Sequence, residues 1–374
     1  MNLENIKSKT RDFLHSESFK NITASIICAL IGIIVGFVIL LLINAQNAPK
    51  AMSTILKNFM YYKKPSMRSY YLGITLVKSV PLIFCAFSVM FAYKTGLFNI
   101  GIGGQYCIGI GASLLCALQF HLPWYLCVLA SVVVAALWGA IVGIFKALWN
   151  VNEVIASIMM NWIALYAVNI LMAKETMMNL TRSETYTIMS RSAKSILPSL
   201  GLGKLFNNNQ YVTIAIPLTI VFAVAIMIVL NKTTFGYELK ATGLNKYAAK
   251  YAGMNDKMNI ITTMAIAGAL GGFAASFYFL TDIQPWKTSS AVPAMGFSGI
   301  AVAFLGGLNP IGIIFAGFFI EHISLGGTLI DMRYYNPQIA DLISSIIIYV
   351  CAFVLFIKYL LGKITERKGK GAEK

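Results

Sequence analysis

Few residues in this chain have the types and spacing that covalent chemistry requires. The sequence contains no G-x-x-x-x-G-K-[ST] loop for nucleotide phosphates, no H-E-x-x-H pair for zinc and no G-x-S-x-G nucleophile turn. The three histidines are scattered, and all six cysteines lie in apolar runs without paired spacing, which is typical of small buried side chains. The sequence therefore predicts neither an enzyme nor a metal or cofactor on this chain.

Polar side chains occur instead as isolated groups within apolar segments. The run GLFNIGIGGQ at 96–105 places the amides of Asn99 and Gln105 on a glycine-rich backbone. Neutral amides donate and accept hydrogen bonds without carrying a charge, so they suit an uncharged ligand with hydroxyls and ring nitrogens; a tight turn between two spans is the alternative. In NEVIASIMMNWIALY, Asn152 is expected to cap a helix, and the deeper Asn161 to hydrogen-bond another helix or face a cavity.

Charged residues within apolar segments are rarer still. Lys78 lies roughly a third of the way into a span, where a cation either snorkels to the membrane surface or faces a polar cavity or partner. Glu321 is the carboxylate that an ion-coupled carrier could use, and it keeps such a carrier as a weak alternative. The residues expected along a substrate pathway are Phe98, Asn99, Gln105, Asn161, Lys78 and Phe297.

The composition places these groups in a membrane. Of 374 residues, 58% are hydrophobic and only 12% are charged, a balance that excludes a soluble domain of this size. The formal net charge is +16. Because the cations gather at span ends and in loops, we interpret them as contacts to membrane lipid and solvent rather than to nucleic acid. The first apolar run, 22–43, is too long for the hydrophobic region of a signal peptide.

Segments of about 20 apolar residues, enough to cross the hydrocarbon core, predict an all-α polytopic membrane protein with about ten transmembrane helices over 22–360. The segments are 22–44, 72–93, 104–120, 124–146, 153–173, 211–230, 258–280, 289–307, 310–330 and 338–360. HLPW at 121–124 and Asn309-Pro310 separate neighbouring spans, because proline lacks an amide donor and restricts the residue before it. Glycine clusters in each half suggest a pseudo-repeat of two halves.

The charge distribution predicts the orientation of the chain. With both termini cytoplasmic, the inside segments are cation-rich: the tail at 1–21, the central loop at 231–257 and the basic tail at 361–374. The long loops 45–71 and 173–210 then lie outside. Loop 45–71 contains Lys and Arg but no acidic residue, which is typical of a solvated or lipid-facing loop; a docking surface for an external partner is the alternative.

Four runs in order, FNIGIGGQ, NEVIASIMMNWIALY, GYELKATGLNKYAAKYAGM and GIAVAFLGGLNPIG, resemble the membrane permeases of nucleoside-uptake ABC transporters. These belong to a larger group with ribose and branched-chain amino acid permeases. The resemblance covers about residues 72–360, and FNIG..GQ with YAGM favours the nucleoside branch over simple-sugar permeases. Gly103 stands where the family commonly has an acidic residue, and Trp162 stands where tyrosine is common. The first 70 residues match only in having a span and an external loop.

The resemblance implies a multi-pass transport subunit of the cell membrane that imports nucleosides. It implies a cytoplasmic ATPase that binds the ATP, a second related permease that forms a heterodimer with this chain, and an extracytoplasmic substrate-binding lipoprotein. An importer for simple sugars or another small polar solute is the nearest alternative.

The polar run at 236–253 corresponds in this resemblance to a coupling helix that fits a groove of the ATPase; an ordinary connecting helix is the alternative. Gly243 and Gly253 would set the turns at its ends. The expected ATPase contacts are Glu238, Lys240, Gly243, Asn245, Lys246, Tyr247, Lys250, Tyr251 and Gly253.

Overall fold

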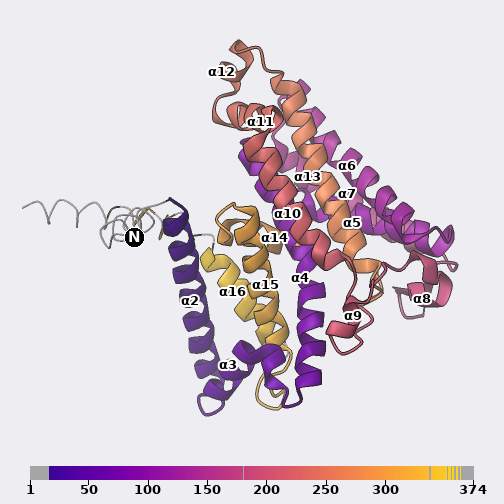
Figure 1. Cartoon of the computed structure of the whole chain (residues 1–374), viewed down its shortest axis with the longest axis vertical. Helices are drawn as coiled ribbons and strands as arrows, with labels where there is room; N and C mark the ends of the chain where they lie inside the picture. The colour runs from indigo at the N-terminus through magenta and orange to yellow at the C-terminus, as the bar shows by residue number, and fades with distance from the viewer. Residues whose placement is uncertain are drawn as a thin grey trace, which may run out of the picture. The chain divides into compact units, whose positions relative to one another are not determined.

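The computed structural model describes residues 17–179, 181–336, 338–351, 353–354, 356–357, 359–360 and 363. Most of the predicted tails at 1–21 and 361–374 therefore lie outside the described residues. Helices dominate the described chain (Figure 1), and the described residues contain one short antiparallel pair of strands.

Eight of the described helices are long and apolar enough to cross a membrane. They are α2 (Glu17–Ile43), α4 (Pro65–Lys94), α5 (Ile102–Leu114) with the π-turn η2 (Leu115–Gln119), α6 (Trp124–Trp149), α7 (Glu153–Met172), α10 (Ala215–Lys232), α13 (Asp256–Phe279) and α15 (Pro310–Gly327). The two other predicted spans appear as shorter apolar helices, α14 (Ala294–Leu305) and α16 (Ile339–Cys351), and the sequence after α16 is only partly described. The prediction of an all-α polytopic membrane protein is confirmed.

Local sequence signals set several of the helix starts. The Asn152 side chain accepts hydrogen bonds from Val154 N at 2.9 Å and Ile155 N at 3.4 Å, which confirms the predicted cap of α7. Asn309 caps α15 in the same way, and Pro310 occupies the first helical turn, where its missing amide hydrogen has no consequence. The predicted breaks between neighbouring spans are therefore real helix ends.

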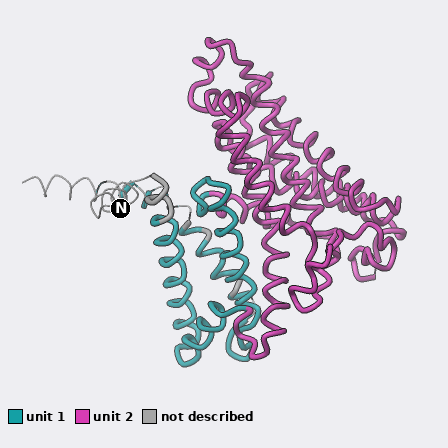
Figure 2. The backbone as a smooth tube through the Cα atoms, viewed as in Figure 1, with its two compact units in different colours: residues 1–58, 304–374 teal, residues 59–303 magenta. Residues whose placement is uncertain are grey.

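The chain divides into two compact units, coloured separately in Figure 2. Unit 2 comprises Phe59–Ala303, and unit 1 comprises Met1–Asn58 together with Phe304–Lys374.

In unit 2, α13 is the central helix and packs against α4, α5 and α6. Its contact with α6 depends on glycine, because a Cβ at Gly268 would overlap the carbonyl of Ala135. Ser131 Oγ lies 2.9 Å from Gly109 O and 2.8 Å from Gly272 O, so one buried hydroxyl links three helices. Small side chains thus let the membrane helices approach closely.

The predicted loop 173–210, also in unit 2, is a folded segment. It contains β1 (Met178–Asn179), β2 (Glu184–Thr185), α8 (Ile188–Arg191), the 3-10 turn η3 (Ala193–Ser195) and α9 (Leu202–Leu205). The segment after α13 fastens it: Trp286 N donates to Thr185 Oγ1 at 3.0 Å, and Asp282 accepts the amides of Ile188 and Met189.

In unit 1, α2 and α16 pack together, and the predicted loop 45–71 begins with the helix α3 (Ala48–Lys57). The 3-10 turn η1 (Asn58–Tyr61) follows it in the sequence. α3 buries its apolar side and exposes its lysines. It is held to α15 by His322, whose Nε2 lies 3.0 Å from Leu56 O and whose Nδ1 lies 3.3 Å from Asn58 Nδ2. Because α4 starts at Pro65, the remaining connection is much shorter than predicted.

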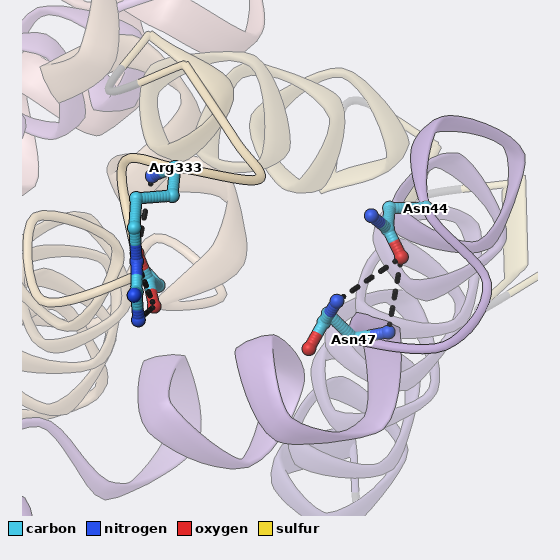
Figure 3. A network of polar contacts seen from close by, with 4 residues as sticks. Asn44, Asn47 and Arg333 are labelled. Carbon is cyan, nitrogen blue, oxygen red and sulfur yellow. Dashed lines mark hydrogen bonds and ion pairs between the residues drawn. The ribbon is translucent and has the colours of Figure 1, made fainter.

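Polar contacts fix the corner between α2 and α3. The backbone N and Nδ2 of Asn47 both donate to Asn44 Oδ1, as Figure 3 shows, and Tyr335 donates its hydroxyl to Asn44 O at 2.8 Å.

In the same unit, the Arg333 guanidinium binds both carboxylate oxygens of Asp331 and lowers the pKa of that carboxyl to about 2. The pair therefore stays ionised at physiological pH.

Candidate functional site

The predicted coupling segment, in unit 2, consists of two short helices, α11 (Thr234–Leu244) and α12 (Lys246–Tyr251). Thr233 caps the first helix through a 3.1 Å bond from Gly236 N. Asn245 caps the second, since its Oδ1 accepts the amides of Tyr247 and Ala248, both at 3.0 Å. Asn245 thus separates two helices within what the sequence presents as one polar run.

One side of this segment is strongly exposed. Leu244, Tyr247 and Tyr251 are 89%, 84% and 97% exposed, whereas Ala249 on the opposite side of α12 is 3% exposed. Lys250 and Asn245 are also exposed. Large apolar side chains that protrude next to a cation are typical of a surface that a partner protein covers.

Two of the cations predicted to contact a partner are engaged within the chain. Lys246 forms an ion pair of 3.4 Å with Asp256, a buried carboxylate at the start of α13. Lys240 Nζ donates to Asn231 Oδ1 at 3.3 Å, and Glu238 is half-buried on the same helix. The two lysines hold α11 to α10 and α12 to α13.

Gly243 has a different role from the one predicted. It lies inside α11 and sets no turn, so that prediction is wrong, whereas Gly253 has a φ of +84° and does end α12 in a turn. A Cβ on Gly243 would lie 2.6 Å from Thr95 C and 2.7 Å from Gly96 N. Gly243 is therefore required for the close approach of α11 to the connection between α4 and α5.

A series of buried polar contacts starts at the same place. Asn259 Nδ2 on α13 donates to Thr242 Oγ1 on α11 at 3.0 Å. One helical turn further along α13, Thr263 Oγ1 donates to Thr95 Oγ1, at the end of α4, at 3.1 Å. All four side chains are at most 5% exposed. The coupling segment is thus linked through α13 to the connection between α4 and α5.

The next turn of α13 reaches the predicted amide pair. Ser88 on α4 donates to Ala267 O at 2.7 Å and accepts from Asn99 Nδ2 at 3.0 Å. Asn99 and Gln105 exchange two hydrogen bonds, of 2.9 and 3.2 Å, and are 0% and 1% exposed. The two amides therefore bind each other, and their contact with substrate stays a prediction that would require α4, α5 and α13 to move apart.

Asn161 on α7 fixes the start of α5. Its Oδ1 accepts from Gly104 N at 2.7 Å, and its Nδ2 donates to Ile100 O at 3.0 Å. The expectation that this amide hydrogen-bonds another helix is confirmed.

The glycine at 103 also has a structural explanation. A Cβ on Gly103 would lie 2.9 Å from Val292 Cγ1, and one on Gly296 would lie 2.6 Å from the Gly103 Cα. The start of α14 and the residue Val292 before it thus leave no room for a larger side chain at position 103. Trp162, the other departure, is 43% exposed on α7.

The remaining pathway candidates lie apart from the amides. Lys78 is half-buried on α4, ten residues before Ser88, which corresponds to about 15 Å along a helix. Phe98 is half-buried beside Asn99, and Phe297 on α14 is 47% exposed. The structure therefore does not gather Lys78 into the amide cluster.

Two buried polar atoms on α7 were not predicted from the sequence. Ser157 Oγ and Asn169 Oδ1 are buried and have no hydrogen-bond partner among the described residues. Asn169 Nδ2 donates to Ser289 O at 2.8 Å. The spacing of Ser157 from Asn161, one helical turn, was a signal that could have identified the first of them.

Comparison with known proteins supports the resemblance to ABC transporter permeases over most of the chain. Residues 71–352 match the family model described as branched-chain amino acid transport system / permease component. The chain is 34% identical to the guanosine ABC transporter permease protein NupP of Bacillus subtilis, over 81% of this chain and 86% of NupP.

It is also 34% identical to the nucleoside ABC transporter permease protein NupB of Lactococcus lactis, over 81% of this chain and 85% of NupB. Its identity to the glucose ABC transporter permease protein TsgB13 of Haloferax volcanii is 28%, over 80% and 81% of the two chains. No solved structure matches.

Proposed function

Because the chain belongs to the branched-chain amino acid transport system permease family, we propose that it is the membrane subunit of an ABC importer for nucleosides. The observation that carries the substrate class is the 34% identity to two nucleoside permeases over more than four-fifths of both chains. The identity to a glucose permease is lower, at 28%. The chain is a multi-pass protein of the cell membrane.

In this proposal ATP is bound and hydrolysed by a separate cytoplasmic ATPase. The exposed side of the coupling segment, with Tyr247, Lys250 and Tyr251, docks into that subunit. Its apolar and aromatic surface supplies the buried core of such an interface, and the lysine lies at its rim.

In this proposal, contacts within unit 2 transmit the movement of the coupling segment to the membrane helices. A displacement of α11 would push directly on the connection between α4 and α5, because the backbones of Gly243 and Gly96 are in contact. It also acts on α13 through Asn259 and Thr263. Both paths end at the Asn99 amide, so closure of the ATPase would shift α4 and α5 and alternate the access of the substrate path.

Two further partners complete the proposed importer. A second, related permease would pair with this chain as a heterodimer. An extracytoplasmic lipoprotein would deliver the nucleoside to the external side, where Lys63, Lys64 and Arg68 are exposed. No nucleic acid is involved.

Uptake of labelled substrates tests the proposal. In cells that lack this chain, uptake of labelled nucleosides is expected to fall, and re-expression of the chain should restore it. Glucose uptake, measured in the same cells, should not change. Unchanged uptake of every nucleoside and deoxynucleoside would contradict the substrate class, and a selective loss of glucose uptake would favour the sugar alternative.

A further inference from the structure

An apolar groove lies between α6, α10 and α13, all in unit 2. Its volume is about 280 Å³, and its walls include Trp124, Tyr125 and Leu129 from α6, with Phe222, Phe273 and Phe277 from the other two helices. Tyr125 and Leu129 are 56% and 57% exposed, so the groove opens at the outer surface of the helices.

The chemistry of the walls excludes a nucleoside. The indole N–H of Trp124 and the hydroxyl of Tyr125 are the only side-chain hydrogen-bonding groups among the lining residues, all of which the structure describes. A ribose and a base would leave several hydroxyl and amide groups without partners, each of which is costly in an apolar site. A hydrocarbon chain carries no such groups, and α6 spans the membrane, so its open side faces acyl chains.

An exposed lysine lies on the segment that packs against the start of α6. The hydroxyl of Ser195 donates to Leu122 O, two residues before Trp124, and this bond places η3 beside the start of α6. The neighbouring Lys194 is exposed and forms no ion pair with any described residue. Aromatic residues at a span end mark the depth of the lipid headgroups, so a phosphate at this depth lies within reach of a lysine.

We propose that this groove is a binding site for an anionic phospholipid, with one acyl chain along Leu129 and the phenylalanines and the phosphate near Lys194. Charge complementarity favours an anionic headgroup over a zwitterionic one. Phe222, Phe273 and Phe277 also contact Phe84, with ring centroids 5.3, 5.9 and 5.4 Å away, so the bound chain would support the packing of α4 as well.

The experiment is native mass spectrometry of the full-length chain, purified in detergent with added phosphatidylglycerol or phosphatidylcholine. The wild type is expected to retain one phosphatidylglycerol. Leu129→Trp, which fills the groove, should lose most of it, whereas Leu137→Trp, a lipid-exposed control on the same helix, should keep it. Lys194→Gln should remove the preference for phosphatidylglycerol, and Lys204→Gln, an exposed control, should not.

Fluorescence provides a readout that does not depend on a groove-filling variant. Phosphatidylglycerol brominated in its acyl chain should quench the wild type more than Trp124→Phe, because Trp124 lines the groove. Equal retention by the two leucine variants, together with equal quenching, would overturn the proposal. Displacement of the lipid by guanosine would also overturn it and would assign the groove to the transported substrate. Loss of the lipid when a second permease binds would assign it to a permease interface.

Discussion

Replacement of Gly243 with alanine tests the mechanical link between the coupling segment and the membrane helices. The new Cβ would lie 2.6 Å from Thr95 C, 2.7 Å from Gly96 N and 2.9 Å from Lys94 O, and none of these backbone atoms can rotate away. Ordinary contact begins at 3.4 Å, so α11 and the α4–α5 connection would have to separate by about 0.8 Å.

Two opposing terms set the effect on stability. Overpacking of this kind costs about 1–3 kcal/mol, and alanine stabilises a helix interior by about 1 kcal/mol relative to glycine. The net loss of roughly 0–2 kcal/mol is small against the 5–15 kcal/mol typical of a folded domain, so the variant is expected to insert and fold. Coupling free energies between sites are typically about 1–3 kcal/mol, so uptake is expected to fall roughly 5- to 150-fold.

The assay measures nucleoside uptake per amount of inserted protein, with thermal unfolding of the purified variant as the stability readout. Gly201→Ala is the matched control. It introduces the same group at a φ of +82°, where backbone strain is similar in size but the Cβ meets no atom within 4 Å. If Gly243→Ala transports as well as the control, the contact between α11 and the α4–α5 connection does not transmit movement to the membrane helices.

Three further predictions concern the same network and surface. Thr263→Val removes the buried hydrogen bond to Thr95 at the end of α4 and is expected to destabilise the protein by about 1 kcal/mol and to slow uptake. The control Thr262→Val removes a hydrogen bond within α13 alone and should have a smaller effect on uptake. Equal uptake by the two variants would contradict the route through α13. Asn99→Leu removes both hydrogen bonds of the buried Gln105 amide and is expected to cost about 1–3 kcal/mol for each unsatisfied group, measured as a lower unfolding midpoint. An unchanged midpoint would show that the Asn99 amide is not structural. Tyr251→Ala is expected to abolish co-purification of the ATPase without changing stability, whereas Tyr237→Ala, on α11, should retain it; retention by both variants would place the docking surface elsewhere.

The sequence was sufficient for features with local causes. Apolar runs long enough to cross the hydrocarbon core identified the long helices. Asn152 and Asn309-Pro310 marked two helix starts, because capping residues and prolines act on the helical turn that follows them. The polar run at 236–253 could likewise be recognised as a connection between two membrane helices, α10 and α13. Its division into two helices depends on one capping amide, Asn245, and was not recognised.

Features that depend on tertiary contacts could not be predicted from the sequence. Asn99 and Gln105 have the chemistry of a ligand site, but whether they bind a ligand or each other depends on how α4, α5 and α13 pack. Gly243 could equally have served a turn or a close approach, and only the position of Thr95 decides between them. A pseudo-repeat of two halves and the cytoplasmic location of both termini stay predictions.

The central claim is that this chain forms an ATP-driven path for nucleosides. The most direct measurement is uptake of labelled guanosine by proteoliposomes that contain the complex purified through this chain, with ATP enclosed on the side of the coupling segment. We expect accumulation that requires ATP, is unaffected by collapse of ion gradients and is strongly reduced in Gly243→Ala. Accumulation that persists without ATP and stops when the gradients collapse would contradict it and would favour an ion-coupled carrier that uses Glu321.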